Sequence, residues 1–249
     1  MYLNEYSGRD IRIAVIDSGV HADHPHVGGV EHGVGIRSDG SLDADYIDRL
    51  GHGTAVTAAI REKAPDAVVI AVKVFWDTLS TNVSALVRGM DEACAHGATV
   101  INLSLGTPNV EHRPLLEAAV ERAASAGAIL VTALEDRGTV WLPGSLAGVV
   151  PVVLDWDCPR EEYRLKADSD RRVVLASGYP RDIPNVPRER NLKGISFAVA
   201  NATGFVARAM EAMMRTRASA GPVNERVGEI MRMLENGLAS DTGCSATRL

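Results

Sequence analysis

The feature that most constrains the fold of this chain is the alternation of short apolar runs with longer helical stretches. The predicted strands are residues 12–17, 67–75, 99–105, 128–134, 149–154 and 173–176. Several of them are continuously apolar, which is typical of strands covered on both faces. The predicted helices are residues 52–63, 82–96, 113–125, 196–216 and 223–236. The alternation predicts a three-layer α/β/α fold, in which helices cover both faces of a mostly parallel sheet.

The chain has room for one domain. Of its 249 residues, 46% are hydrophobic, which is enough for a single substantial core, and we find no internal repeat. We therefore expect one domain over residues 1–249, in which 20–50 and 155–193 are the least regular segments. Residues 237–249 follow the last predicted helix, and we expect them to fray.

Charge and hydropathy exclude several classes of partner. A net charge of -6, without a basic block, argues against nucleic acid. No run approaches the roughly 20 apolar residues of a membrane-spanning helix. The first ten residues lack the basic start and apolar core of a secretory signal, and little chain precedes Asp17. We expect a cytoplasmic protein with neither signal peptide nor pro-domain.

Three residues with catalytically capable side chains stand at the ends of predicted elements. Asp17 ends an apolar strand, whereas His52 and Ser196 each follow a glycine at the start of a predicted helix. A serine hydroxyl needs a base within hydrogen-bond reach to act as a nucleophile, and imidazole suits that task. A carboxylate then fixes the imidazole tautomer and stabilises the imidazolium. The three residue types together predict acyl transfer.

These segments, in the order Asp, His, Ser, resemble those of the subtilisin-like serine proteases. The resemblance runs from residue 11 to about 214 and includes Val-Ile-Asn-Leu-Ser-Leu-Gly at 100–106. It implies a subtilisin-like sheet, with Asp17, His52 and Ser196 as the catalytic triad. It also implies that substrate binds as an added strand along 104–106. The substrate-binding residues expected from it are Ser104, Leu105, Gly106, Ala133, Leu134, Glu135 and Trp141.

The chain departs from this family at the oxyanion hole, which must present hydrogen-bond donors where negative charge develops. In the family one donor is the backbone N–H of the nucleophile, here Ser196. Another is an asparagine amide, whose position Asp136 takes in an ungapped comparison. An ionised carboxylate has no proton to donate. Either Asp136 carries a proton when substrate is bound, as a catalytic residue, or the fold is inactive.

Trp141 falls where the resembled family has a residue at the base of the primary specificity pocket. A bulky indole at that place leaves room only for a small substrate side chain before the cleaved bond. The alternative is that Trp141 packs outward or into the core. A peptide series that varies this substrate position distinguishes the two.

No metal or cofactor is expected. His21, His24 and His26 lie near one another, but short spacing on an irregular loop disfavours convergent ligand geometry. No compact carboxylate loop demands calcium, and no phosphate-binding glycine motif indicates a nucleotide. The three cysteines are odd in number and far apart, which predicts neither a disulfide framework nor a zinc site.

Three functions are compatible with these residues. The first is a selective cytoplasmic endopeptidase that removes a leader from a peptide or subunit precursor. In its compact form the chain resembles the leader-processing subtilases, such as the one associated with the small subunit of quinohemoprotein amine dehydrogenase. The second is a general protease of unfolded chains, and the third is a catalytically silent peptide-binding module. The sequence leaves the oligomeric state open.

Overall fold

A sheet of nine strands forms the centre of the fold within residues 3–168, 171–216 and 223–242, which the computed structural model describes. The strand order is β10-β11-β9-β6-β5-β1-β4-β2-β3. The central strands are parallel and comprise β1 (Arg12–Asp17), β4 (Val68–Lys73), β5 (Val100–Leu103), β6 (Ile129–Ala133) and β9 (Val149–Leu154). Antiparallel pairs stand at both edges: β2 (His32–Ile36) with β3 (Leu42–Asp43), and β11 (Arg171–Ala176) with β10 (Tyr163–Asp168).

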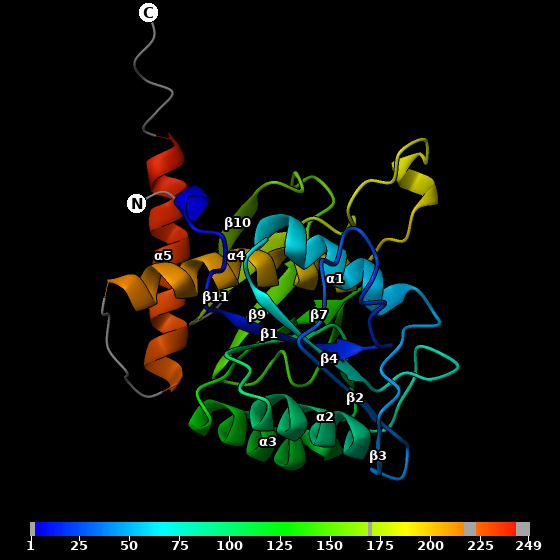
Figure 1. Ribbon diagram of the computed structural model, residues 1–249. Helices are drawn as coiled ribbons and strands as arrows, with labels where there is room; N and C mark the ends of the chain where they lie inside the picture. The colour runs from blue at the N-terminus through cyan, green and yellow to red at the C-terminus, as the bar shows by residue number, and fades with distance from the viewer. Residues whose placement is uncertain (1–2, 169–170, 217–222, 243–249) are drawn as a thin grey trace, which may run out of the picture.

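Helices cover both faces of this sheet (Figure 1). One face carries α2 (Val83–Ala95) and α3 (Arg113–Ser125), and the other carries α1 (His52–Lys63), α4 (Ile195–Arg215) and, against α4, α5 (Val223–Thr242). In β1, Ile13 and Val15 join the core on the α1 and α4 side, whereas Ala14 and Ile16 join the core on the α2 side. Because both faces of the strand are buried, a continuously apolar run is stable there. The predicted three-layer α/β/α architecture is confirmed.

Most elements lie where the sequence predicts them. The bounds of β1, β9, α1 and α3 are those predicted, and α2 is one residue shorter at each end, where Asn82 and His96 are the caps. The two segments predicted to be least regular contain strands: 20–50 contains β2 and β3, and 155–193 contains β10. Edge strands are partly exposed, so they lack the continuous apolar run that marks the central strands.

The last helix ends later than the sequence predicts, because α5 continues to Thr242 instead of ending at residue 236. Tertiary packing explains the difference. The Tyr163 hydroxyl donates a hydrogen bond to the carbonyl of Leu234, and a Cβ atom on the buried Gly237 would lie 2.7 Å from that hydroxyl oxygen and 3.1 Å from Leu3. Residues 243–249 lie outside the described part of the chain.

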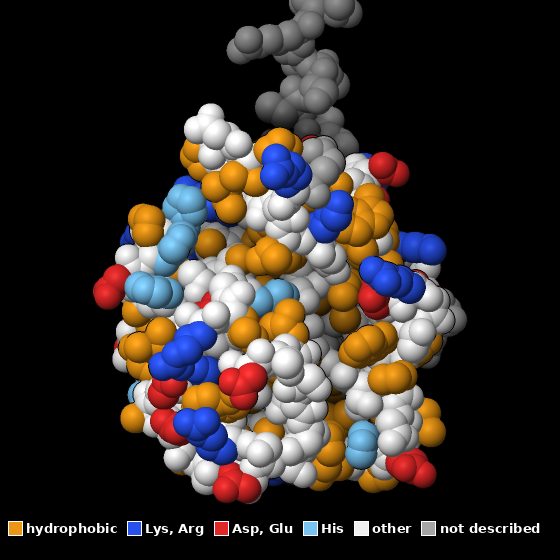
Figure 2. Space-filling model, turned by 90° about the vertical axis from the view of Figure 1, so that its right-hand side faces the viewer, with side chains coloured by type: hydrophobic (Ala, Val, Ile, Leu, Met, Phe, Trp, Pro, Cys, Tyr) orange, Lys and Arg blue, Asp and Glu red, His pale blue; other side chains and the backbone are white. Residues whose placement is uncertain are grey.

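The carboxyl ends of the parallel strands meet at one face of the molecule. Loops that follow these strands gather on the right-hand side of Figure 1, and Figure 2 looks onto that side. Binding sites of open parallel sheets lie at this edge. Among the helices in the described part of the chain, none has the length and apolar character that a membrane crossing needs.

Candidate active site

Asp17 and His52 meet at the carboxyl end of β1. His52 is the first residue of α1, and its Nδ1 lies 2.7 Å from Oδ1 of Asp17. The Asp17 side chain is fully buried, and the His52 side chain is 13% exposed. A proton on Nδ1 donates this hydrogen bond, which leaves Nε2 of the neutral ring as a proton acceptor. The pair has the geometry of a base oriented by a carboxylate.

Gly53 permits this close approach of α1 to β1. A Cβ atom on Gly53 would lie 2.2 Å from the carbonyl oxygen of Gly19 and 3.2 Å from Cβ of Asp17. Only a residue without a side chain fits between these atoms. The glycine after His52 is therefore needed to bring the first turn of the helix onto the end of the strand.

The electrostatic environment of His52 favours its protonated form. Burial lowers the pKa of the imidazole, but the hydrogen bond and charge of Asp17, together with the charge of Asp48, outweigh burial and raise it above the usual 6.5. Nearby carboxylates stabilise positive charge on the ring. The site can therefore stabilise the imidazolium that forms when His52 accepts a proton.

Ser196 lies in the first turn of α4 and lines the same cleft as His52. The helix follows Gly194, whose φ of 145° favours glycine. Among the described residues, the Ser196 hydroxyl makes one long hydrogen bond, of 3.5 Å, to the carbonyl oxygen of Ser104, and none to His52. In enzymes without substrate, the contact between nucleophile and base is often long and tightens in the complex.

A buried chain of polar side chains connects α4 with the end of β5. Thr203 Oγ1 donates to Asn102 Oδ1 at 2.9 Å, and Asn102 Nδ2 donates to Ser104 Oγ at 3.1 Å. Ser104 Oγ in turn lies 3.4 Å from the carbonyl oxygen of Ser196. Sequence reasoning missed Asn102 and Thr203. Their signal is a polar residue inside an otherwise apolar element, which needs a buried partner.

Two cavities flank Ser196. The first has a volume of about 480 Å³ and is lined by His52, Ser196, Ser104, Leu105, Gly106 and Trp141, among others. The second has a volume of about 660 Å³ and is lined by Glu135, Asp136, Leu154, Trp156, Lys193 and Ser196, among others. The structure thus brings all but three of the predicted site residues to a cavity beside Ser196. The exceptions are Asp17, which is buried and bonded to His52, and Ala133 and Leu134.

Ala133 and Leu134 are buried and line neither of these two cavities. The backbone N–H of Leu134 donates to the carbonyl of Val152, and its own carbonyl accepts from Trp141. The backbone N–H and carbonyl of Leu134 are thus paired within the protein. The substrate-binding role of Ala133 and Leu134 stays a prediction.

Trp141 packs against the strand end that is predicted to bind substrate. Thr107 and Leu142 exchange two backbone hydrogen bonds of 2.9 Å, which bring the indole beside Gly106. A Cβ atom on Gly106 would lie 3.2 Å from Cε3 of Trp141. The indole therefore narrows the cleft at this point instead of pointing outward.

Asp136 lies in β7 (Glu135–Asp136), which pairs with β8 (Thr139–Val140). Its side chain is half-buried, and within the described residues its carboxylate makes no hydrogen bond or ion pair. The carboxyl group is therefore open to an incoming ligand in the second cavity. With a proton, the carboxyl group can donate a hydrogen bond to a negative oxygen; without one, it repels that oxygen.

The histidines of the loop after β1 lie close to the start of α1, where the N–H of His21 donates a hydrogen bond to Oγ1 of Thr54 at 3.1 Å. The rings of His24 and His26 meet edge to face, with centroids 5.2 Å apart. Among the residues that the structure describes, no group of three or more histidine, cysteine or acidic side chains is placed to hold a metal ion.

Residues 8–152 match the profile of the subtilase family. The chain belongs to the subtilase family. This subtilase is 30% identical over 217 residues to subtilisin of Bacillus pumilus, covering 80% of the chain and 74% of that protein. It is 27% identical over 217 residues to subtilisin E of Bacillus subtilis, covering 80% of the chain and 53% of that protein. The chain spans about half of the length of several curated relatives that it matches, and less than a quarter of others.

Solved structures agree with the fold of this subtilase. A mutant of the protease domain of PatA superposes with a TM-score of 0.67 at 24% identity, covering 93% of the chain and 98% of that domain. A cold adapted subtilisin-like serine proteinase superposes with a TM-score of 0.65 at 23% identity, covering 88% of the chain and 80% of that protein. These likenesses show the subtilisin-like fold.

Sequence reasoning missed a second acidic residue beside the subtilase's histidine. Asp48 stands four positions before His52, and its buried carboxylate accepts several hydrogen bonds from the start of α1. The signal that could have found it is an aspartate shortly before a helix whose own N-cap residue, Gly51, has no side chain to cap it.

Proposed function

We propose that this subtilase is a serine endopeptidase that hydrolyses peptide bonds through an acyl-enzyme on Ser196. The observation that carries the proposal is the 2.7 Å contact between Asp17 and His52 at a cleft that Ser196 also lines. His52 takes the hydroxyl proton as Ser196 Oγ attacks the carbonyl carbon, and then gives that proton to the leaving amine. Water, with His52 again as base, then attacks the acyl group and restores the hydroxyl.

The negative oxygen of each tetrahedral intermediate needs donors. The backbone N–H of Ser196 lies at the start of α4, where helical amides have no partner within the helix. Asp136 lines the second cavity with Ser196 and supplies the other hydrogen bond when its carboxyl group carries a proton. Its half-buried position beside Ser196, with no hydrogen bond or ion pair to its carboxylate from a described residue, supports this role.

Labelling with a fluorophosphonate tests the nucleophile. The wild-type chain should be labelled, and mass spectrometry should place the label on Ser196, because such probes need a serine activated by a base. Ser196→Ala should lose labelling and lower kcat by about 10⁶-fold. A folded wild-type chain that neither reacts nor cleaves peptides would instead be a silent peptide-binding module.

We infer that the substrate is a peptide or protein precursor from which a leader is removed. Trp141, packed beside Gly106, narrows the cleft next to the nucleophile, which supports selection of a small residue before the cleaved bond. The resemblance to leader-processing subtilases supports the same class. The small subunit of quinohemoprotein amine dehydrogenase is one precursor to test.

Mass spectrometry of precursor digests tests the substrate class. Candidate precursors from the same genomic neighbourhood should be cut at one bond that separates leader from core, and Ser196→Ala provides the control. Casein should be cut slowly, because the narrowed cleft rejects most side chains. Rapid cleavage of casein at many bonds would favour the general protease and end the leader-removal proposal.

A further inference from the structure

The carboxylate of Asp48 caps the helix that begins at His52. Its Oδ1 accepts hydrogen bonds from the backbone N–H groups of Leu50 and Gly51 at 2.9 and 2.8 Å. Its Oδ2 accepts from the N–H and the hydroxyl of Thr54 at 2.8 and 2.6 Å. Amides of a first helical turn have no partner within the helix, and Gly51 has no side chain to cap them. Asp48 satisfies groups on both sides of His52.

Ser18 joins Asp48 to the carboxylate that holds the imidazole. The Ser18 hydroxyl donates to Oδ1 of Asp48 at 2.9 Å and accepts from the N–H of Gly53 at 2.9 Å. The N–H of Ser18 donates to Oδ1 of Asp17 at 2.7 Å. Asp17, Ser18 and Asp48 are all buried, so water does not compete for these bonds. One buried network therefore includes the Asp17 carboxylate and the residues that flank His52.

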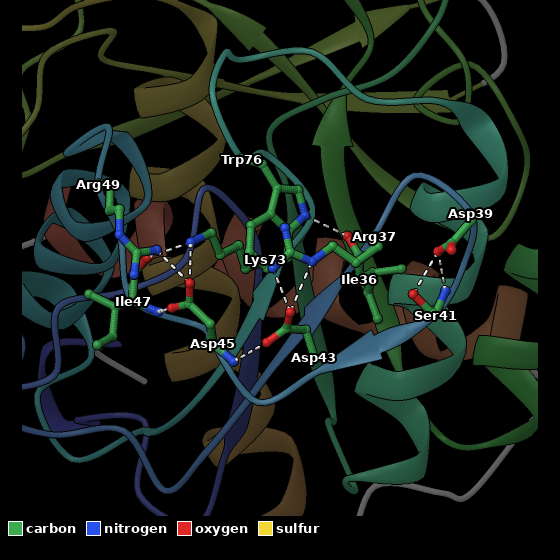
Figure 3. Close-up of polar contacts among 10 residues, drawn as sticks. All are labelled: Ile36, Arg37, Asp39, Ser41, Asp43, Asp45, Ile47, Arg49, Lys73 and Trp76. Atoms are coloured by element: carbon green, nitrogen blue, oxygen red, sulfur yellow. Dashed lines mark hydrogen bonds and ion pairs between the residues drawn. The ribbon is translucent and has the colours of Figure 1, made fainter.

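The loop that carries Asp48, residues 44–51, is itself fixed to the sheet (Figure 3). Lys73 ends β4 beside Asp17 and is 1% exposed at its side chain. Its Nζ donates to the carbonyl of Ile47 at 2.8 Å and lies 3.4 Å from Oδ2 of Asp45. The ring of Trp76 lies 4.3 Å from the same ammonium. A buried ammonium requires such partners, so these contacts keep the loop against the sheet.

Two carboxylates raise the pKa of the His52 imidazole. Asp17 reaches it from β1, and Asp48 acts on it from the loop before α1. From α4, the residues beside the ring are Ser196 and Phe197, which carry no charge. Burial lowers the pKa of His52, whereas Asp17 and then Asp48 raise it. Neutralising Asp48 should therefore lower that pKa.

We propose that Asp48 is a positioning residue for His52, which holds the first turn of α1 on the end of β1 so that the imidazole meets Asp17 before substrate arrives. Asp48 does not line the cleft that His52 and Ser196 share, so it acts through His52 and not on substrate. The effect of Asp48 on kcat rests on the proposed peptidase function, whereas its effect on the pKa of His52 does not depend on that function.

Asp48→Asn in the full chain tests the proposal. An amide keeps the size of the side chain but loses the charge and can accept at only one oxygen. In the variant, NMR titration should give a lower His52 pKa, with the resonance assigned from His52→Gln. The acid limb of kcat/KM should move to lower pH, and kcat should fall about tenfold or more with KM unchanged, because a small displacement of the base slows proton transfer.

Asp39→Asn is the matched control. Asp39 is exposed, and its carboxylate accepts hydrogen bonds from Ser41 in the turn between β2 and β3, which precedes the loop that carries Asp48 (Figure 3). It should leave the His52 titration and kcat unchanged. An Asp48→Asn chain with the wild-type titration and kcat overturns the proposal. If the wild-type chain neither reacts with a fluorophosphonate nor cleaves peptides, the proposed function fails and the NMR titration alone decides on Asp48.

If circular dichroism shows that Asp48→Asn does not fold, Ser18→Ala takes its place. It removes the hydroxyl between Asp48 and Gly53 but keeps both carboxylates. A fall in kcat of about fivefold, with KM unchanged, supports the proposal, since one hydrogen bond contributes about that factor. An unchanged kcat overturns it.

Discussion

The two sides of the cleft differ in how firmly their functional groups are held. On one side His52 is bonded to Asp17, and buried hydrogen bonds through Ser18 and Asp48 fix the surrounding backbone. On the other side Asp136 lies in a two-residue strand, half-buried, with no bond to its carboxylate from any described residue. The proposed base is therefore placed before substrate arrives, whereas the proposed second oxyanion donor acts only when it carries a proton. Preorganised groups contribute most to catalysis. Substitutions on the two sides of the cleft should therefore change kcat by different factors.

Asp17→Asn breaks the firmly held side and should have the largest effect among the variants that compare the two sides. The amide no longer fixes the imidazole tautomer, so kcat should fall by about 10⁴-fold. The measurement is kcat on a peptide that the wild-type chain cleaves. Asp23→Asn, at an exposed residue of the following loop, should keep wild-type activity. A loss of less than about tenfold in Asp17→Asn would contradict the assigned role.

Trp141→Gly changes the cleft without touching the His52 network. Removing the indole beside Gly106 should open room for a large side chain, so kcat/KM for substrates with an aromatic residue before the cleaved bond should rise about tenfold to a hundredfold. A peptide series that varies this position provides the measurement. Trp156→Gly, in the second cavity, is the control and should leave the series unchanged. A wild-type preference for large aromatic residues would contradict the prediction.

The pH dependence of kcat/KM reports the pKa of His52, on the firmly held side of the cleft. His52 acts as base only when neutral, and its pKa is raised above 6.5 by Asp17 and Asp48. Below that raised pKa, kcat/KM should fall about tenfold per pH unit, with the midpoint above 6.5. The same shift affects stability: the folded state gains from protonated His52 fully below pH 6.5 and loses that gain as pH rises through the folded pKa. A midpoint below 6.5 would contradict the geometry.

Asp136→Asn tests the loosely held side of the cleft and should have the smallest effect on kcat. An amide donates at every pH, so kcat should rise about twofold to tenfold, and its dependence on pH should weaken. The rate should be measured from neutral to alkaline pH. Asp157→Asn, at an exposed aspartate, is the matched control and should leave the rate and its pH dependence unchanged. Loss of activity in Asp136→Asn would show that Asp136 is not an oxyanion donor.

The sequence predicted the elements whose residues are buried on both faces. β1 and β9 have the predicted bounds, and most of their residues are buried, which leaves a largely apolar run in the sequence. The edge strand β10 was missed, since it is partly exposed and carries the charged residues Arg164, Lys166 and Asp168. The last turns of α5 were missed because Leu3 and Tyr163, from distant parts of the chain, pack against them.

The candidate site divides in the same way. Asp17, His52 and Ser196 could be found from the sequence because each stands next to glycine or a turn at the end of a strongly patterned element. Asp48 was missed although it stands shortly before a helix, because its bond to Ser18 joins the loop before α1 to the turn after β1, and the sequence does not show that contact. The backbone pairing of Leu134 with Val152 could not be predicted either, because it depends on which strand lies beside β6.

By itself, the sequence determined the order of a carboxylate, an imidazole and a hydroxyl and the elements that present them, because hydrophobic periodicity and glycine are local properties. Only the tertiary structure decided which polar groups surround the imidazole and which backbone groups remain open to a substrate. Those contacts follow from sheet register and from the approach of α1 to β1, which join residues far apart in the chain and are set by packing.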